Sequence, residues 1–140
     1  MRTRIIVASA LFVLNVHGAF AKETTAQSTA APGSFSGDWA KKKDPFCQMT
    51  LTENGNKLTG TYSTSPNSNG KPAQKGRIEG NITKPGHAAA SYTSEFANKG
   101  SKGKVELDLT GTGLKWTLVT PPTQDYGEDY SPKSVVLTKQ

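Results

Sequence analysis

Alternation of apolar and polar residues with a period of two is the feature that most limits what this chain can fold into. Val105, Leu107 and Leu109 are separated from one another by single charged residues. Successive side chains of a β-strand point to opposite faces of the sheet, so this pattern predicts a strand with one buried face. Similar alternation recurs from Cys47 onward, and no segment of that region shows helical periodicity. The fold class is therefore predicted to be all-β.

About eight short segments of this kind follow one another, most of them joined by short turns. Asn54-Gly55 fits a tight hairpin turn, because both residues tolerate a positive φ angle. Sequential antiparallel strands with one apolar face must curl or stack to hide that face, and closure also removes exposed edges. We therefore predict a single antiparallel up-and-down β-barrel of about eight strands, with a small β-sandwich as the alternative.

The side chains predicted to fill the interior are mostly large and apolar, and they share one parity within each strand. They are Cys47, Met49, Leu51, Leu58, Tyr62, Ile78, Ile82, Tyr92, Phe96, Val105, Leu107, Leu109, Leu114, Trp116, Leu118 and Leu137. A barrel of about eight strands is just filled by side chains or holds one small ligand.

The N-terminus has the three parts of a secretory signal peptide. Arg2 and Arg4 form a basic start, residues 5–16 an apolar run, and Ala19-Phe20-Ala21 an A-x-A cleavage signal. The apolar run is too short for a membrane span. We expect cleavage after Ala21 and a protein that is secreted or periplasmic.

The predicted organisation therefore has three parts: a signal peptide at residues 1–21, a flexible linker at 22–34 and the β-barrel domain at 35–140. The linker is predicted because its residues are small and polar and bury too little surface to offset their ordering entropy.

Composition argues against an enzyme. Removal of Arg2 and Arg4 lowers the net charge from +6 to +4, and removal of the signal peptide leaves His87 and Cys47 as the single histidine and cysteine. Nucleophilic triads and zinc sites need histidine, paired cysteines or clustered carboxylates. His87 is expected in a solvated turn, and Cys47 is expected to be a buried, inert thiol. We predict no catalytic residue, no cofactor and no metal site.

Two short motifs carry a family resemblance. Gly37-Asp38-Trp39, followed by Leu58-Thr59-Gly60-Thr61-Tyr62, resembles the opening of avidin-like and lipocalin-like (calycin) barrels. The resemblance implies that Trp39 plugs the closed end of the barrel, that Tyr62 offers a hydroxyl to a pocket, and that Thr64 lies near the mouth. The chain departs from the avidin-like pattern at Lys41 and Pro45 and has a single downstream tryptophan, so biotin is not the expected ligand. An interior site for a small apolar ligand would be lined by Tyr62, Thr64, Tyr92 and Trp116.

Two other groups of residues are candidates for binding. An acidic, aromatic loop contains the candidate partner-binding residues Asp125, Tyr126, Glu128, Asp129 and Tyr130. Tyrosine is favoured at recognition surfaces because it brings a large apolar face with little rotamer entropy to lose. Lys41, Lys42 and Lys43 form a basic patch that suits an acidic polymer. Nucleic acid is disfavoured, because no aromatic residues are interleaved with these lysines to stack on bases.

These observations favour a secreted or periplasmic, non-enzymatic binding protein. Its loops, 63–74 and 121–132, would engage a protein partner in the cell envelope or outside the cell, for example as an inhibitor or immunity-type protein against an envelope hydrolase. The alternative is a calycin-like barrel that binds a small apolar ligand. A third hypothesis is that the chain is a module that binds a polyanion or a glycan.

Overall fold

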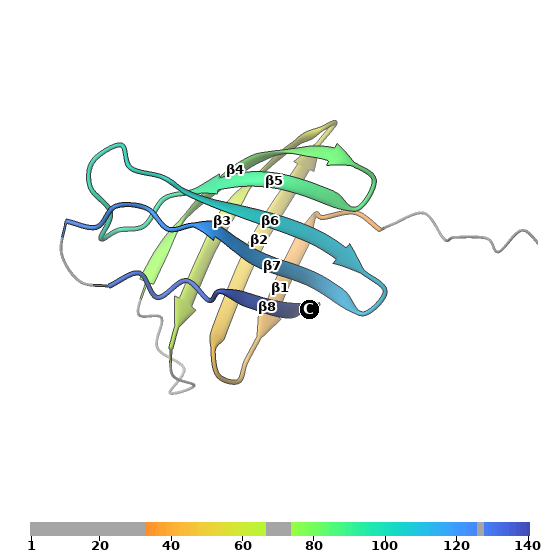
Figure 1. Ribbon diagram of the computed structural model, residues 1–140. Helices are drawn as coiled ribbons and strands as arrows, with labels where there is room; N and C mark the ends of the chain where they lie inside the picture. Colours follow the sequence, from red (N-terminus) through yellow and green to blue (C-terminus); the bar gives the residue numbers. More distant parts are fainter. Residues whose placement is uncertain (1–32, 67–73, 126–127) are drawn as a thin grey trace, which may run out of the picture.

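Each strand of the structure has an inner apolar face and an outer polar face, as the alternation requires. The computed structural model describes residues 33–66, 74–125 and 128–140, and its strands form one closed barrel in which every neighbouring pair is antiparallel (Figure 1). The strands are β1 (Gly37–Lys41), β2 (Phe46–Asn54), β3 (Lys57–Ser65), β4 (Gln74–Lys84), β5 (His87–Tyr92), β6 (Gly103–Thr110), β7 (Gly113–Thr120) and β8 (Ser134–Lys139). The predicted up-and-down barrel is confirmed, and the β-sandwich alternative is wrong. The signal peptide and the linker up to residue 32 lie outside the described residues.

One apolar cluster fills the barrel. Its buried members are Phe35, Trp39, Cys47, Met49, Leu51, Leu58, Tyr62, Ile78, Ala88, Ala90, Tyr92, Val105, Leu107, Leu114, Trp116, Val135 and Leu137. Most of the predicted interior is confirmed by this set. Ile82, Leu109 and Leu118 are half-buried and pack against the cluster. None of the described segments is a helix of the length and hydropathy that crossing a membrane requires.

The prediction that Phe96 belongs to the interior set is wrong. β5 ends at Tyr92, and the Ser94 hydroxyl then accepts a hydrogen bond from the Phe96 backbone N–H at 3.1 Å. Side-chain bonds of this kind offer the backbone an alternative to the sheet ladder. Phe96 is therefore only partly buried, and its ring meets Tyr130 edge to face.

The long loop predicted for residues 63–74 is shorter in the structure. β3 continues to Ser65, and β4 begins at Gln74, with Thr64 opposite Gln74 in the ladder. The polar composition of these residues hid their alternation, because Thr64 and Gln74 occupy inward positions that are usually apolar.

Two bulky side chains cover the end of the barrel where the hairpin turns lie. Trp39 and Phe35 are buried there, and the Trp39 indole N–H donates to the Phe35 carbonyl oxygen at 2.8 Å. Glu53 Oε2 accepts from the Phe35 backbone N–H at 2.9 Å and so holds the incoming chain against β2. Trp39 thus lies at a covered end, next to Gly111 and Thr112 of the β6–β7 turn.

His87 does not lie in the solvated turn that the sequence predicted. It is the first residue of β5, and its Nδ1 lies 2.6 Å from Asp108 Oδ1 on β6. The two residues are cross-strand partners, so the ladder itself brings the ring and the carboxylate together.

Candidate functional site

The mouth, the end of the barrel opposite Trp39, brings the predicted interior residues together. The ring centroids of Tyr62, Tyr92 and Trp116 lie 5.2–5.7 Å apart, at angles typical of favourable aromatic pairs. These three residues are 3 %, 0 % and 0 % exposed. Thr64, two residues along β3 from Tyr62, is fully buried as well. The four residues therefore share one region of the interior, which they fill with their own side chains.

A polar network closes the mouth above this aromatic cluster, and its centre is Gln74. The Gln74 Nε2 atom lies 2.8 Å from the Tyr62 hydroxyl, 2.8 Å from Asp129 Oδ1 and 3.1 Å from Ser131 Oγ. Its Oε1 accepts from the Tyr130 backbone N–H at 2.7 Å. A single buried amide thus holds the β7–β8 loop against β3 and β4.

The β7–β8 loop makes two further bonds to the aromatic cluster. The Tyr92 hydroxyl donates to Asp129 Oδ2 at 2.9 Å, and the Trp116 indole N–H donates to the Pro132 carbonyl oxygen at 2.9 Å. The Tyr62 hydroxyl donates to the Thr93 carbonyl oxygen at 3.0 Å. Residues 129–132 therefore cover the mouth, and we call them the mouth segment.

Burial changes the ionisation of the groups beneath the mouth segment. It raises the pKa of Tyr62 to about 12 and raises the pKa of Tyr92 well above its ordinary value. Burial also raises the pKa of the Cys47 thiol to about 12, in keeping with its predicted inert character. Thr64 Oγ1 is buried and has no hydrogen-bond partner among the residues that the structure describes.

The candidate partner-binding loop has two kinds of residue. Asp129 and Tyr130 take part in closing the mouth, whereas Asp125 and Glu128 are exposed to solvent. Tyr126 lies outside the described residues. Of the candidate residues that the structure describes, the carboxylates of Asp125 and Glu128 are the ones exposed to a partner.

The basic patch lies apart from the interior site. Lys41 ends β1, and Lys42 and Lys43 are exposed in the turn that follows. The three lysines line a hollow of about 410 Å³ together with Ala40, Val136, Thr138 and Gln140.

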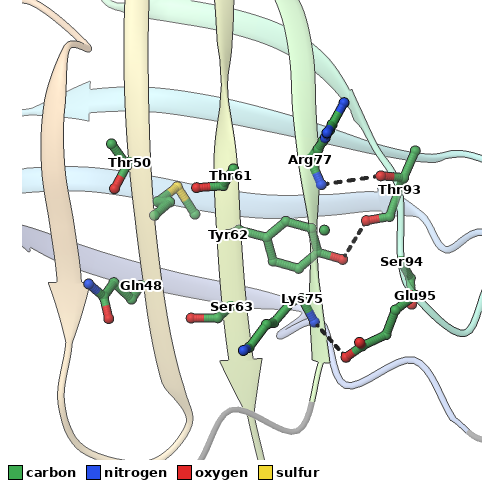
Figure 2. A pocket seen from close by; sticks show the side chains of 12 residues that line it. Gln48, Thr50, Thr61, Tyr62, Ser63, Lys75, Arg77, Thr93, Ser94 and Glu95 are labelled. Atoms are coloured by element: carbon green, nitrogen blue, oxygen red, sulfur yellow. Dashed lines mark hydrogen bonds between the residues drawn. The ribbon is translucent and has the colours of Figure 1, made fainter.

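A second hollow, which sequence reasoning did not identify, crosses the outer wall of the barrel. This groove of about 590 Å³ lies over β2, β3, β4 and the chain after β5 (Figure 2). Its outward-pointing lining residues are Gln48, Thr50, Thr61, Ser63, Lys75, Arg77, Thr93, Ser94 and Glu95. The signal was present in the sequence, since Lys75 and Arg77 alternate with the inward Gly76 and Ile78.

The carboxylates do not form a cluster in the part of the chain that the structure describes. Glu53 binds Ser34 and Phe35, Glu79 pairs with Lys102 at 3.7 Å, and Glu95 accepts from the Lys75 backbone N–H. Across residues 33–66, 74–125 and 128–140, no group of three His, Cys, Asp or Glu residues is placed to hold a metal ion.

Fold and geometry define the chain as an antiparallel eight-stranded β-barrel with a filled interior and a mouth covered by its own β7–β8 loop. Comparisons of the chain with protein-family models, curated proteins and solved structures found no match.

Proposed function

We propose that this chain is a non-enzymatic binding protein that works in a periplasm or after secretion and recognises a protein partner through the loops at its barrel mouth. The observation that carries the proposal is the closure of the mouth. The buried Gln74 amide fastens the mouth segment over an interior already filled by Tyr62, Tyr92 and Trp116. The outer surface is therefore the part of the molecule that we expect to recognise a partner.

The loops at the mouth support each other, which suits a recognition surface. Ala97 and Gln124 form an isolated β-bridge between the β5–β6 and β7–β8 loops. The Asn98 backbone N–H donates to the Thr123 carbonyl oxygen at 2.9 Å, and the Asp125 N–H donates to the Phe96 carbonyl oxygen at 3.0 Å. Figure 1 shows these two loops side by side at one end of the barrel. A surface ordered in advance loses less conformational entropy on binding.

The partner class that we propose is an envelope hydrolase or another extracytoplasmic protein with a basic surface. Asp125 and Glu128 project from this end of the barrel and are exposed. Complementary charge speeds association and fixes orientation more than it adds affinity. An inhibitor or immunity-type role would use these carboxylates to steer the partner onto the mouth.

A calycin-like ancestry and a small apolar ligand form the second candidate. The buried Trp39 at the covered end and the inward Tyr62 agree with the resemblance of their motifs, and the unpartnered Thr64 hydroxyl favours a ligand inside. Such a ligand would have to displace the mouth segment and its bonds to Gln74 and Tyr92.

Capture from an extract of the producing organism's envelope tests the first candidate. We expect the purified protein to retain one protein in stoichiometric amount and the Asp125→Lys, Glu128→Lys double variant to lose it. A Glu106→Lys variant is the matched control, because Glu106 is an exposed acid on the outer face of β6, away from the mouth. It should retain the partner.

Two outcomes would contradict the proposal. Equal capture by the double variant would show that the mouth loops do not make the contact. An apolar small molecule that co-purifies with the protein, in the absence of a protein partner, would favour the interior ligand.

A further inference from the structure

We call the hollow of about 590 Å³ over β2, β3, β4 and the chain after β5 the outer groove, and most of its lining comes from the strands of the sheet. Three adjacent strands contribute side chains in register: Gln48, Ser63 and Lys75 form one row, and Thr50, Thr61 and Arg77 form the next (Figure 2). Neighbouring strands lie about 4.8 Å apart, and residues two apart on one strand about 7 Å apart. The groove is therefore a lattice of hydrogen-bonding groups held by a rigid sheet.

One wall of this groove depends on a glycine. A Cβ atom at position 76 would overlap the Thr93 carbonyl oxygen and come within 2.6 Å of Tyr62 Cε1. Because Gly76 has no side chain, the chain after β5 approaches β4 closely. The Thr93 N–H donates to the Arg77 carbonyl oxygen at 2.9 Å, and the Glu95 N–H donates to the Lys75 carbonyl oxygen at 3.1 Å.

The chemistry of the lining is cationic and hydroxylic. Lys75 and Arg77 are exposed, and neither cation has an ion-pair partner among the described residues. Glu95 is the one carboxylate among the described lining residues, and its Oε1 accepts from the Lys75 backbone N–H at 3.1 Å. The hydroxyl groups of Thr61 and Ser63 on β3 lie between the two cations and β2, where Gln48 adds an amide group.

The groove lacks the apolar outward side chains that a protein segment would need for affinity. The large apolar residues that line it among the described residues are Met49 and Tyr62, which are 1 % and 3 % exposed. Protein interfaces take most of their binding energy from buried aromatic, Met and Arg anchors. Of these, the outward lining described here supplies Arg77 and no exposed aromatic or Met side chain. A ligand that is polar over its whole surface matches this lining better.

We propose that the outer groove binds a short stretch of an acidic glycan, a chain of sugar units that carry carboxylates. A sugar carboxylate accepts charge-assisted hydrogen bonds from Arg77 and Lys75. The ring hydroxyls of the glycan exchange hydrogen bonds with Thr50, Thr61 and Ser63. This site includes residues 93–95 of the β5–β6 loop but neither Asp125 nor Glu128, and it does not depend on the proposed protein partner.

Titration calorimetry with tetragalacturonate at low salt tests the site, using protein expressed from the full-length sequence. We expect binding of tetragalacturonate and none of its fully methyl-esterified form, which keeps the sugar chain without the charge. The Lys75→Gln, Arg77→Gln double variant should bind roughly tenfold more weakly or worse, since each charge-assisted bond contributes strongly. Amide shifts in the nitrogen–proton NMR spectrum should be centred on Thr61 and Arg77.

Lys84→Gln is the matched control, because Lys84 is an exposed lysine at the other end of β4. It should bind tetragalacturonate as the unaltered protein does. Circular dichroism of each variant checks the fold, and we expect spectra equal to that of the unaltered protein.

Three results would overturn the proposal. The first is that tetragalacturonate does not bind. The second is that the double variant binds it as well as the unaltered protein, which would exclude the groove. The third is equal binding of tetraglutamate, which would show that the groove selects carboxylates of any polymer and has no preference for a glycan. Capture by the mouth loops is measured separately and is unaffected by each of these results.

Discussion

At the scale of single residues, Gln74 joins parts of the chain that are far apart in sequence. Its amide contacts Tyr62 on β3 and both Asp129 and Tyr130 in the β7–β8 loop. Replacement by leucine keeps the size of the side chain but leaves these buried polar groups without their partner. We expect Gln74→Leu to lower the free energy of unfolding by about 2–4 kcal/mol, measured by urea denaturation.

Gln48→Leu is the control for this change, because Gln48 is an exposed residue on the outer face of β2. It should change the free energy of unfolding by no more than about 0.5 kcal/mol. If both variants lost the same free energy of unfolding, the hydrogen bonds of Gln74 would add no more stability than an exposed glutamine does.

Tyr62 gives a prediction for alkaline pH. Burial raises its pKa from 10.0 to about 12, so the folded state holds this proton more tightly than the unfolded state does. The stability that this raised pKa contributes is fully present below pH 10 and is lost as the pH rises from 10 to about 12. We expect the free energy of unfolding to fall across this range, and to fall less steeply in Tyr62→Phe.

The quantity to compare is the slope of the free energy of unfolding against pH. The free energy itself is not comparable, because Tyr62→Phe also removes the bond to the Thr93 carbonyl oxygen and lowers stability at every pH. Urea denaturation at several alkaline pH values gives the slope for each protein. The same slope in both proteins would show that Tyr62 ionises as freely in the folded state as in the unfolded one.

At the scale of elements, β4 and the chain after β5 depend on Gly76. A methyl group at this position would overlap the Thr93 carbonyl oxygen, which is backbone and cannot rotate away. Gly76→Ala should therefore push residues 93–95 away from β4 and lower the free energy of unfolding by about 1–3 kcal/mol. Thermal unfolding followed by circular dichroism measures the loss.

Gly111→Ala is the matched change for this test, because a Cβ atom at Gly111 meets nothing within 4 Å. Its effect on stability should be small. A loss as large as that of Gly76→Ala would mean that alanine destabilises turns and strands of this barrel regardless of the space available.

The strand boundaries show what the sequence could and could not predict at this scale. Strands with large apolar residues on one parity, such as β6, were located from the sequence. The start of β4 was not, because its inward residues Gln74 and Gly76 lack apolar bulk, and the role of Gln74 depends on its contact with Asp129, 55 residues away. Alternation continued backwards from Ile78 would have placed both residues on the inner face.

At the scale of the whole molecule, closure of the barrel was predictable, whereas closure of its mouth was not. Closure follows from the single apolar face that sequential strands must hide. The mouth depends on the mouth segment, whose Asp129 turns inward toward Tyr92 although the acidic sequence suggested an exposed loop. The outer groove was likewise hidden, since its residues come from four segments that only the strand register brings together.

The seam between the first and last strands has the shortest ladder of the closed barrel. β1 and β8 share two paired positions, Trp39 with Lys139 and Ala40 with Thr138, whereas β3 and β4 share eight. Local opening takes the fewest bonds where the ladder is shortest. We expect backbone amides of β1 and β8 to exchange with solvent deuterium at least tenfold faster than those of β3 and β4, as measured by NMR.

A variant at the seam sharpens this prediction. The Thr138 hydroxyl donates to the Ala40 carbonyl oxygen at 3.2 Å, so Thr138→Val should speed exchange in β1 and β8 and leave β3 and β4 unchanged. Thr59→Val, at an exposed position on β3, is the control and should leave the seam as it is. If all strands exchange at one rate in every protein, the barrel opens as a single cooperative unit and its two-position seam is no weaker than the rest.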